Sequence, residues 1–149
     1  MRVALDTNVL AYAEGLDDDR RGQLANDLVE ALTVHELVLP VQVSAELTRL
    51  VMKRLGGNAE EAAVIVRRWQ RVCPIHPPST PDTFATALDL AAEHRLQIFD
   101  CIILAASAKA GCQMLLSEDM QDGFVWRGVT VVNPFAATPH PLLADLLRN

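Results

Sequence analysis

The stretch that decides the fold is Met1-Arg2-Val3-Ala4-Leu5-Asp6-Thr7-Asn8. Its apolar residues, Val3 to Leu5, predict a short buried strand, and the polar residues after them predict a turn or the beginning of a helix. The carboxylate of Asp6 is therefore expected at the carboxyl end of the first strand. Asn8 can brace this turn, because a short amide side chain hydrogen-bonds readily to its own backbone.

Strand and helix patterns alternate along the rest of the chain. Apolar runs predict further strands at Leu37–Leu39, Gln113–Leu116 and Val129–Val132. Apolar residues at helical spacing, together with capping residues, predict helices at about 20–32, 40–55, 59–72, 80–94 (from Thr80 or Thr83), 100–111 and 141–147. The alternation predicts an α/β fold whose mostly parallel sheet is covered on both faces. No repeat or break in composition marks a boundary, so residues 1–149 are expected to form one domain.

The composition is that of a globular protein. Hydrophobic residues make up 50% of the 149 and charged residues 21%, enough to bury a core and too apolar for disorder. Charged residues interrupt every apolar run before it could span a bilayer, and the N-terminus lacks the pattern of a signal peptide. We therefore expect a cytoplasmic protein that does not contact the membrane. The three cysteines form no C-x-x-C pair and are expected to be reduced, and the four histidines lack zinc-ligand spacing.

Acidic residues occur at strand ends and helix starts, where a parallel sheet gathers its ligands. Asp6 can be a ligand or simply the N-cap of the following helix, and Glu46 can simply favour a helix dipole. Asp100 has apolar neighbours on both sides; it can cap its helix, but a carboxylate there is costly to bury without a partner such as a metal. Asp119 directly follows an apolar strand, and its neighbour Glu118 competes for the same role.

Together these acids favour a metal site. Carboxylate oxygens are the preferred ligands of Mg²⁺ and Mn²⁺, and clustered aspartates repel one another unless a cation compensates their charge. No phosphate-binding loop, nucleophile elbow or dinucleotide fingerprint offers a competing chemistry. The net charge of −6 argues against a broad basic surface for nucleic acid, but not against an enzyme that reaches a phosphate through a metal.

Four blocks, in order, resemble the PIN-domain family, and within it the VapC-like toxins of prokaryotic toxin–antitoxin pairs. The blocks are Leu5-Asp6-Thr7-Asn8-Val9-Leu10, Val43-Ser44-Ala45-Glu46-Leu47, Phe99-Asp100-Cys101-Ile102-Ile103-Leu104-Ala105-Ala106 and Leu116-Ser117-Glu118-Asp119-Met120. The resemblance implies a three-layer α/β/α fold over nearly the whole chain. It also implies an acidic pocket that binds Mg²⁺ or Mn²⁺ and endonucleolytic cleavage of RNA.

The resemblance also assigns roles by position. The acids that would bind metal and act in catalysis are Asp6, Glu46, Asp100 and Asp119. Glu118 is the alternative for the fourth acid, because both residues of the last block offer a carboxylate. Asn8 and Ser117 would orient these carboxylates.

Partners follow from charge and from the resemblance. Arg49 and Lys53 follow Glu46 at helical spacing i+3 and i+7, so they share its face and are expected to contact RNA phosphates. A second basic cluster at 67–71 is better explained as a solvated helix surface. The resemblance adds a cognate antitoxin and a homodimer as expected partners.

Three other functions share part of this sequence pattern. A phosphatase of the haloacid dehalogenase type also begins with an aspartate after its first strand, but it needs a second acid where this chain has Asn8. A catalytically degenerate PIN domain could serve as an RNA-binding or scaffold module, although all four acids are present. A DNA-directed nuclease is the third, and the lack of helical-arch insertions favours RNA over DNA.

Overall fold

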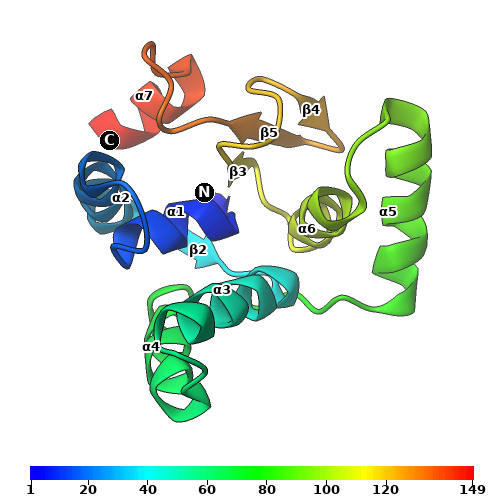
Figure 1. Cartoon of the computed structure of the whole chain (residues 1–149). Helices are drawn as coiled ribbons and strands as arrows, with labels where there is room; N and C mark the ends of the chain where they lie inside the picture. Colours follow the sequence, from blue (N-terminus) through cyan, green and yellow to red (C-terminus); the bar gives the residue numbers. More distant parts are fainter.

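A five-stranded sheet forms the centre of the computed structural model, which describes all of residues 1–149 (Figure 1). The strands are β1 (Arg2–Leu5), β2 (Glu36–Val38), β3 (Met114–Leu116), β4 (Val125–Trp126) and β5 (Val129–Val132), in the order β2-β1-β3-β5-β4. All neighbours pair in parallel except β4, which forms an antiparallel edge with β5. Parallel neighbours require crossover connections, which helices provide here.

Seven helices connect and cover the strands. They are α1 (Thr7–Ala13), α2 (Asp19–Leu32), α3 (Val41–Arg54), α4 (Ala59–Val72), α5 (Pro81–His94), α6 (Ile98–Lys109) and α7 (Pro141–Arg148). Figure 1 shows α2 and α7 on one side of the sheet and α5 and α6 on the other. The three-layer α/β/α fold expected from the sequence is therefore confirmed.

Most helix starts follow from local capping. The side chain of Asp18 accepts hydrogen bonds from the first turn of α2, Asn58 does the same for α4, and Thr80 for α5. These side chains satisfy backbone N–H groups that have no partner within the helix. The predicted boundaries of these helices are accurate for this reason.

One prediction of local structure was wrong, and one short strand was not predicted. Helix α6 begins at Ile98 rather than at Asp100, because the side chain of Gln97 accepts a hydrogen bond from the Asp100 N–H and caps the helix. The short strand β4 was not predicted, since it has only two residues and its antiparallel pairing with β5 depends on the turn at Arg127-Gly128, where both residues have positive φ.

Strands β1 and β3 lie in the middle of the core. Val3, Ala4 and Leu5 are fully buried, and so is the whole of β3, as expected for parallel strands covered on both faces. The register pairs Leu5 with Leu116, and the Asp6 N–H continues the ladder by donating to the Leu116 carbonyl. Residues that follow these two strands therefore lie at the same edge of the sheet.

Helix α7 folds onto the body of the protein, where it buries Leu143 and Leu146 in the core. All three cysteines are free and buried. None of the helices has both the length and the apolar character needed to cross a bilayer.

Candidate active site

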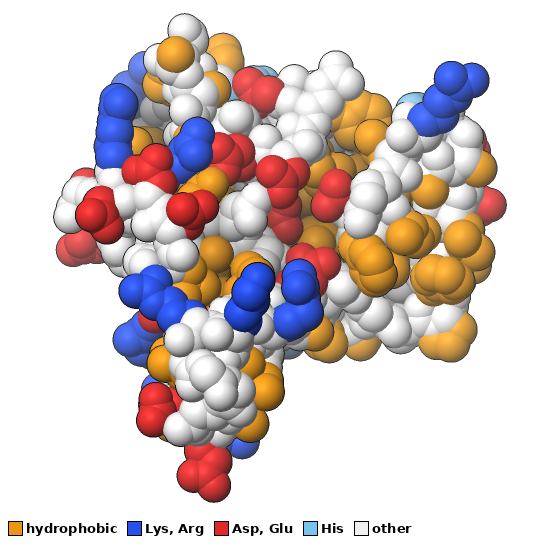
Figure 2. Space-filling view, viewed as in Figure 1, with side chains coloured by type: hydrophobic (Ala, Val, Ile, Leu, Met, Phe, Trp, Pro, Cys, Tyr) orange, Lys and Arg blue, Asp and Glu red, His pale blue; other side chains and the backbone are white.

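One pocket of about 310 Å³ is lined by all four acids named from the sequence. Asp6 follows β1, Glu46 lies on α3, Asp100 lies on α6, and Asp119 follows β3. Figure 2 shows acidic side chains gathered in a hollow in the middle of one face of the molecule. Segments that are up to 113 positions apart in sequence (119 minus 6) thus meet at the carboxyl ends of the parallel strands, where α/β sheets hold ligands.

Asp6 is the most enclosed of the four acids, with only 4% of its surface exposed. One carboxylate oxygen accepts a hydrogen bond from the Thr7 N–H at 2.7 Å, and the other accepts one from Ser117 Oγ at 2.6 Å. Burial raises the pKa of Asp6, the two hydrogen bonds oppose that rise, and the nearby charges of other acids add to it. Asp6 is therefore both the cap of α1 and a wall of the pocket.

Glu46 is fixed by a residue to which sequence reasoning gave no role. The hydroxyl of Thr7 donates to Glu46 Oε2 at 2.6 Å, and Gln42 Nε2 donates to Oε1 at 3.2 Å. Thr7 is itself buried, with 6% of its surface exposed. Its position beside Asp6 in the first turn of a helix was a signal that could have identified it.

Asp100 receives no hydrogen bond at its carboxylate, because Gln97 has taken over the capping of α6. Burial raises the pKa of Asp100 to about 6, and the charges of Asp6, Asp119 and Glu46 contribute to the rise. A half-buried carboxylate that faces three others and lacks a donor is held at a cost in free energy.

The structure separates Asp119 from Glu118. Asp119 lines the pocket and accepts a hydrogen bond from Asn8 Nδ2. Glu118 lies outside the pocket lining and is held by Tyr12, whose hydroxyl donates to it at 2.6 Å, and by an ion pair with Arg21 at 3.0 Å. Glu118 therefore has a structural partner on each side, and Asp119 is the acid that faces the pocket.

Positive charge borders the pocket along α3. Arg49 lines the acidic pocket, while Lys53, one turn further along α3, lines a neighbouring cavity that also contains Asn8. Both side chains are exposed, and neither forms an ion pair within the protein. Figure 2 shows Lys and Arg side chains along this edge of the hollow. In the second basic cluster, by contrast, Arg68 pairs with Glu14.

The donor set of the pocket fits a divalent cation in chemistry and location. Its acids are hard oxygen donors, and burial, together with the charges of the other three acids, raises the pKa of Asp100, a rise that a bound cation would oppose. No three of the His, Cys, Asp and Glu side chains are placed closely enough to hold an ion together. Asp6, Glu46 and Asp119 are instead engaged by hydrogen-bond donors of the protein.

The fold and the pocket define a class: an α/β/α protein with an acidic site at the ends of its parallel strands. The model of the PIN domain matches residues 3–121, and the chain belongs to this family. No curated protein sequence matches it significantly.

Two solved structures are similar to it. VapC20 from Mycobacterium tuberculosis, a toxin that cleaves the Sarcin-Ricin loop, is 19% identical with a TM-score of 0.60, over 78% of this chain and 91% of that one. VapBC2 from Rickettsia felis, solved with a DNA fragment from its promoter, is 16% identical with a TM-score of 0.61, over 80% of this chain and 89% of that one. At such identities the likeness concerns the fold.

The substitution Asp100→Asn is expected to raise the free energy of unfolding, measured with urea at pH 7 in the presence of EDTA. In the folded wild-type protein the pKa of the Asp100 carboxyl is about 6, above its ordinary value of 3.8. Ionisation of this group as the pH rises between these values therefore lowers the free energy of unfolding. Allowing for its partial exposure, the gain should be about 1–2 kcal/mol at pH 7 and should vanish below about pH 4. Asp89→Asn, on the exposed surface of α5, is the control; an equal gain at pH 4 and pH 7 would contradict the explanation.

Proposed function

We propose that the protein is a Mg²⁺- or Mn²⁺-dependent endoribonuclease, that residues 1–149 act as one domain, and that it is the toxin of a toxin–antitoxin pair. The observation that carries the proposal is the shared pocket of Asp6, Glu46, Asp100 and Asp119, in which burial, and then the charges of the other three acids, raise the pKa of Asp100. A carboxylate cluster of this kind is suited to hydrolysis of phosphodiester bonds assisted by a metal.

Both similar structures support the substrate and the partner. VapC20 is a toxin that cleaves the Sarcin-Ricin loop, and VapBC2 was solved bound to a DNA fragment from its promoter. By analogy we infer RNA as the substrate of this chain and a cognate antitoxin as its partner. A second copy of the chain is a further expected partner.

The chain's own residues would bind the cation and an RNA phosphate, and would orient the pocket carboxylates. Asp6, Glu46, Asp100 and Asp119 would hold the cation, which when bound lowers the pKa of a water molecule and stabilises charge on phosphate oxygens. Ser117, Thr7 and Asn8 each donate to one of these carboxylates and fix its direction. Arg49, exposed and unpaired at the pocket's edge, would bind a phosphate of the RNA.

A second candidate is the degenerate PIN domain that binds RNA or serves as a scaffold. The observation in its favour is that no three acids are placed to hold an ion together. Calorimetric titration with Mn²⁺ discriminates between the two: binding near one equivalent supports the nuclease, and no binding supports the scaffold. Incubating the protein with a mixed RNA pool, with and without Mg²⁺ or Mn²⁺, and mapping the cut ends then tests the activity directly.

Asp6→Asn is expected to reduce metal-dependent RNA cleavage by about 100-fold or more while the protein stays folded. The amide oxygen can still accept from the Thr7 N–H, and the Ser117 hydroxyl can turn to accept from the new amide. Cleavage is measured on the mixed RNA pool, and folding by circular dichroism and urea denaturation. Asp89→Asn serves as the matched control, and a folded Asp6→Asn variant with wild-type activity would defeat the assignment.

Asp119→Asn and Glu118→Gln are expected to differ. The first removes a pocket carboxylate and should weaken Mn²⁺ binding by about 10-fold or more. The second should leave Mn²⁺ binding unchanged but lower the free energy of unfolding by about 0.5–1 kcal/mol, because Glu118 pairs with the partly exposed Arg21. Calorimetry and urea denaturation give the two readouts. The reverse pattern would make Glu118 the fourth acid.

Arg49→Glu is expected to weaken RNA binding and to flatten its salt dependence by about 0.7 or more in the slope of log K against log salt. The reason is that one phosphate contact is lost and a negative charge is added beside the acidic pocket. Fluorescence anisotropy of a labelled single-stranded RNA at several salt concentrations measures both effects. Arg67→Glu, on the exposed face of α4, is the matched control; equal affinity of wild type and Arg49→Glu would refute the contact.

A further inference from the structure

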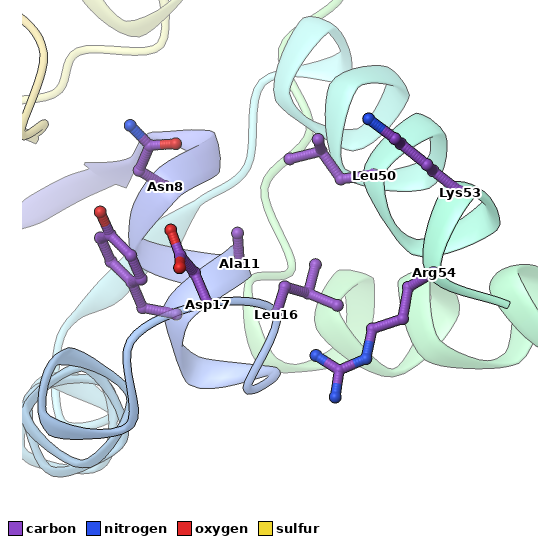
Figure 3. A pocket seen from close by; sticks show the side chains of 8 residues that line it. Asn8, Ala11, Leu16, Asp17, Leu50, Lys53 and Arg54 are labelled. Atoms are coloured by element: carbon purple, nitrogen blue, oxygen red, sulfur yellow. The ribbon is translucent and has the colours of Figure 1, made fainter.

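The largest cavity of the protein, about 590 Å³, lies beside the acidic pocket between α1 and α3. We call it the α1–α3 pocket. Asn8 and Leu50 line both the acidic pocket and the α1–α3 pocket, so the two are contiguous. Figure 3 shows Ala11, Leu16 and Asp17 on one side of this space and Leu50 with Lys53 on the other.

The α1–α3 pocket combines an apolar floor with three charged side chains, of which Arg54 donates to the Gly15 carbonyl and the other two are free. Ala11, Leu16 and Leu50 provide the apolar surface. Lys53 and Asp17 are exposed, and the side chain of neither takes part in a hydrogen bond or an ion pair within the protein. Half of the pocket's eight lining residues are hydrophobic, and its volume lies within the range of about 300–1,000 Å³ found for sites that bind small ligands or parts of larger ones.

We propose that the α1–α3 pocket holds the base of the nucleotide next to the phosphate that is cut, and that Asp17 selects guanine there. The proposal rests on the proposed function, which places that phosphate at the acidic pocket. An RNA strand that lies along α3 past Arg49 would bring its next phosphate to Lys53 and its base to the apolar floor. Proteins read single-stranded RNA in this manner, by taking an unstacked base and bonding its edge.

The selection of guanine follows from the hydrogen-bonding capacity of Asp17. An ionised carboxylate only accepts hydrogen bonds, and it binds best to two parallel donors. The Watson–Crick edge of guanine offers such a pair, the ring N1–H and the exocyclic amino group. Uracil presents two carbonyl oxygens and one N–H on that edge, so its oxygens would face the carboxylate. Adenine and cytosine each offer an amino group beside an acceptor nitrogen.

The test uses the nucleoside monophosphates GMP and UMP, which contain no internucleotide bond that could be cut. Titration followed by amide chemical shifts is expected to move the signals of Leu16, Asp17 and Leu50, with GMP binding about fivefold or more tightly than UMP. Asp17→Asn should bring the affinity for GMP down to that for UMP. Asp19→Asn makes the same charge change two positions away, at an exposed residue outside the pocket, and should keep the preference.

The outcomes separate this proposal from the nuclease itself. Equal binding of GMP and UMP to the wild type, or a preference that survives Asp17→Asn, overturns the guanine site. Absence of shifts with either nucleotide also overturns it and leaves a protein partner as the occupant. If the preference holds and cuts in a mixed RNA pool favour guanine at one flanking position in the wild type but not in Asp17→Asn, the proposal is supported. If the preference holds but no RNA is cut, the proposed function fails while the base site stands.

Discussion

The hydrogen bond from Ser117 to the buried carboxylate of Asp6 joins the ends of β1 and β3, and the geometry of the site depends on it. The two strands are paired so that Leu5 faces Leu116, and the residue after each strand supplies one member of this bond. Because side chains alternate in a strand, a slip of one strand by one position would turn its member of this pair to the opposite face and break the bond. The fully buried apolar residues of both strands prevent such a slip. The position of Asp6 is thus set by core packing.

Charge in the pocket is balanced unevenly, and the imbalance indicates what the pocket can hold. Glu118 is neutralised by Arg21 and bonded to Tyr12, so its charge has a partner within the protein. The four pocket acids have hydrogen-bond donors at most, and Asp100 has none. Donors orient a carboxylate but leave its charge uncompensated. The free energy of that repulsion is available to bind a cation, and the large apolar core is what lets the fold tolerate it.

The fold could be predicted from the sequence because its signals are local. Apolar runs and capping residues, such as Asn58 and Thr80, act within a few positions of the elements they define. The meeting of Asp6 and Asp100 in one pocket could be anticipated, because acids at strand ends and helix starts gather at the carboxyl edge of a parallel sheet. The choice between Glu118 and Asp119 could not, since it is made by Tyr12 and Arg21, about 100 positions away in sequence. The capping role of Gln97 was missed because Asp100, the better capping residue by type, stands three positions later.

Thr7 links the acidic pocket to the α1–α3 pocket beside it. Its N–H donates a hydrogen bond to Asp6, and its hydroxyl donates one to Glu46. One buried residue therefore connects the start of α1 to the middle of α3. Both pockets border these two helices and share Asn8 and Leu50, and the acidic pocket is closed in addition by α6 and the residues after β3. The distance between α1 and α3 therefore bears both on the position of Glu46 and on the width of the neighbouring cavity. A displacement of α1 relative to α3 would therefore alter the hydrogen bond by which Thr7 orients Glu46.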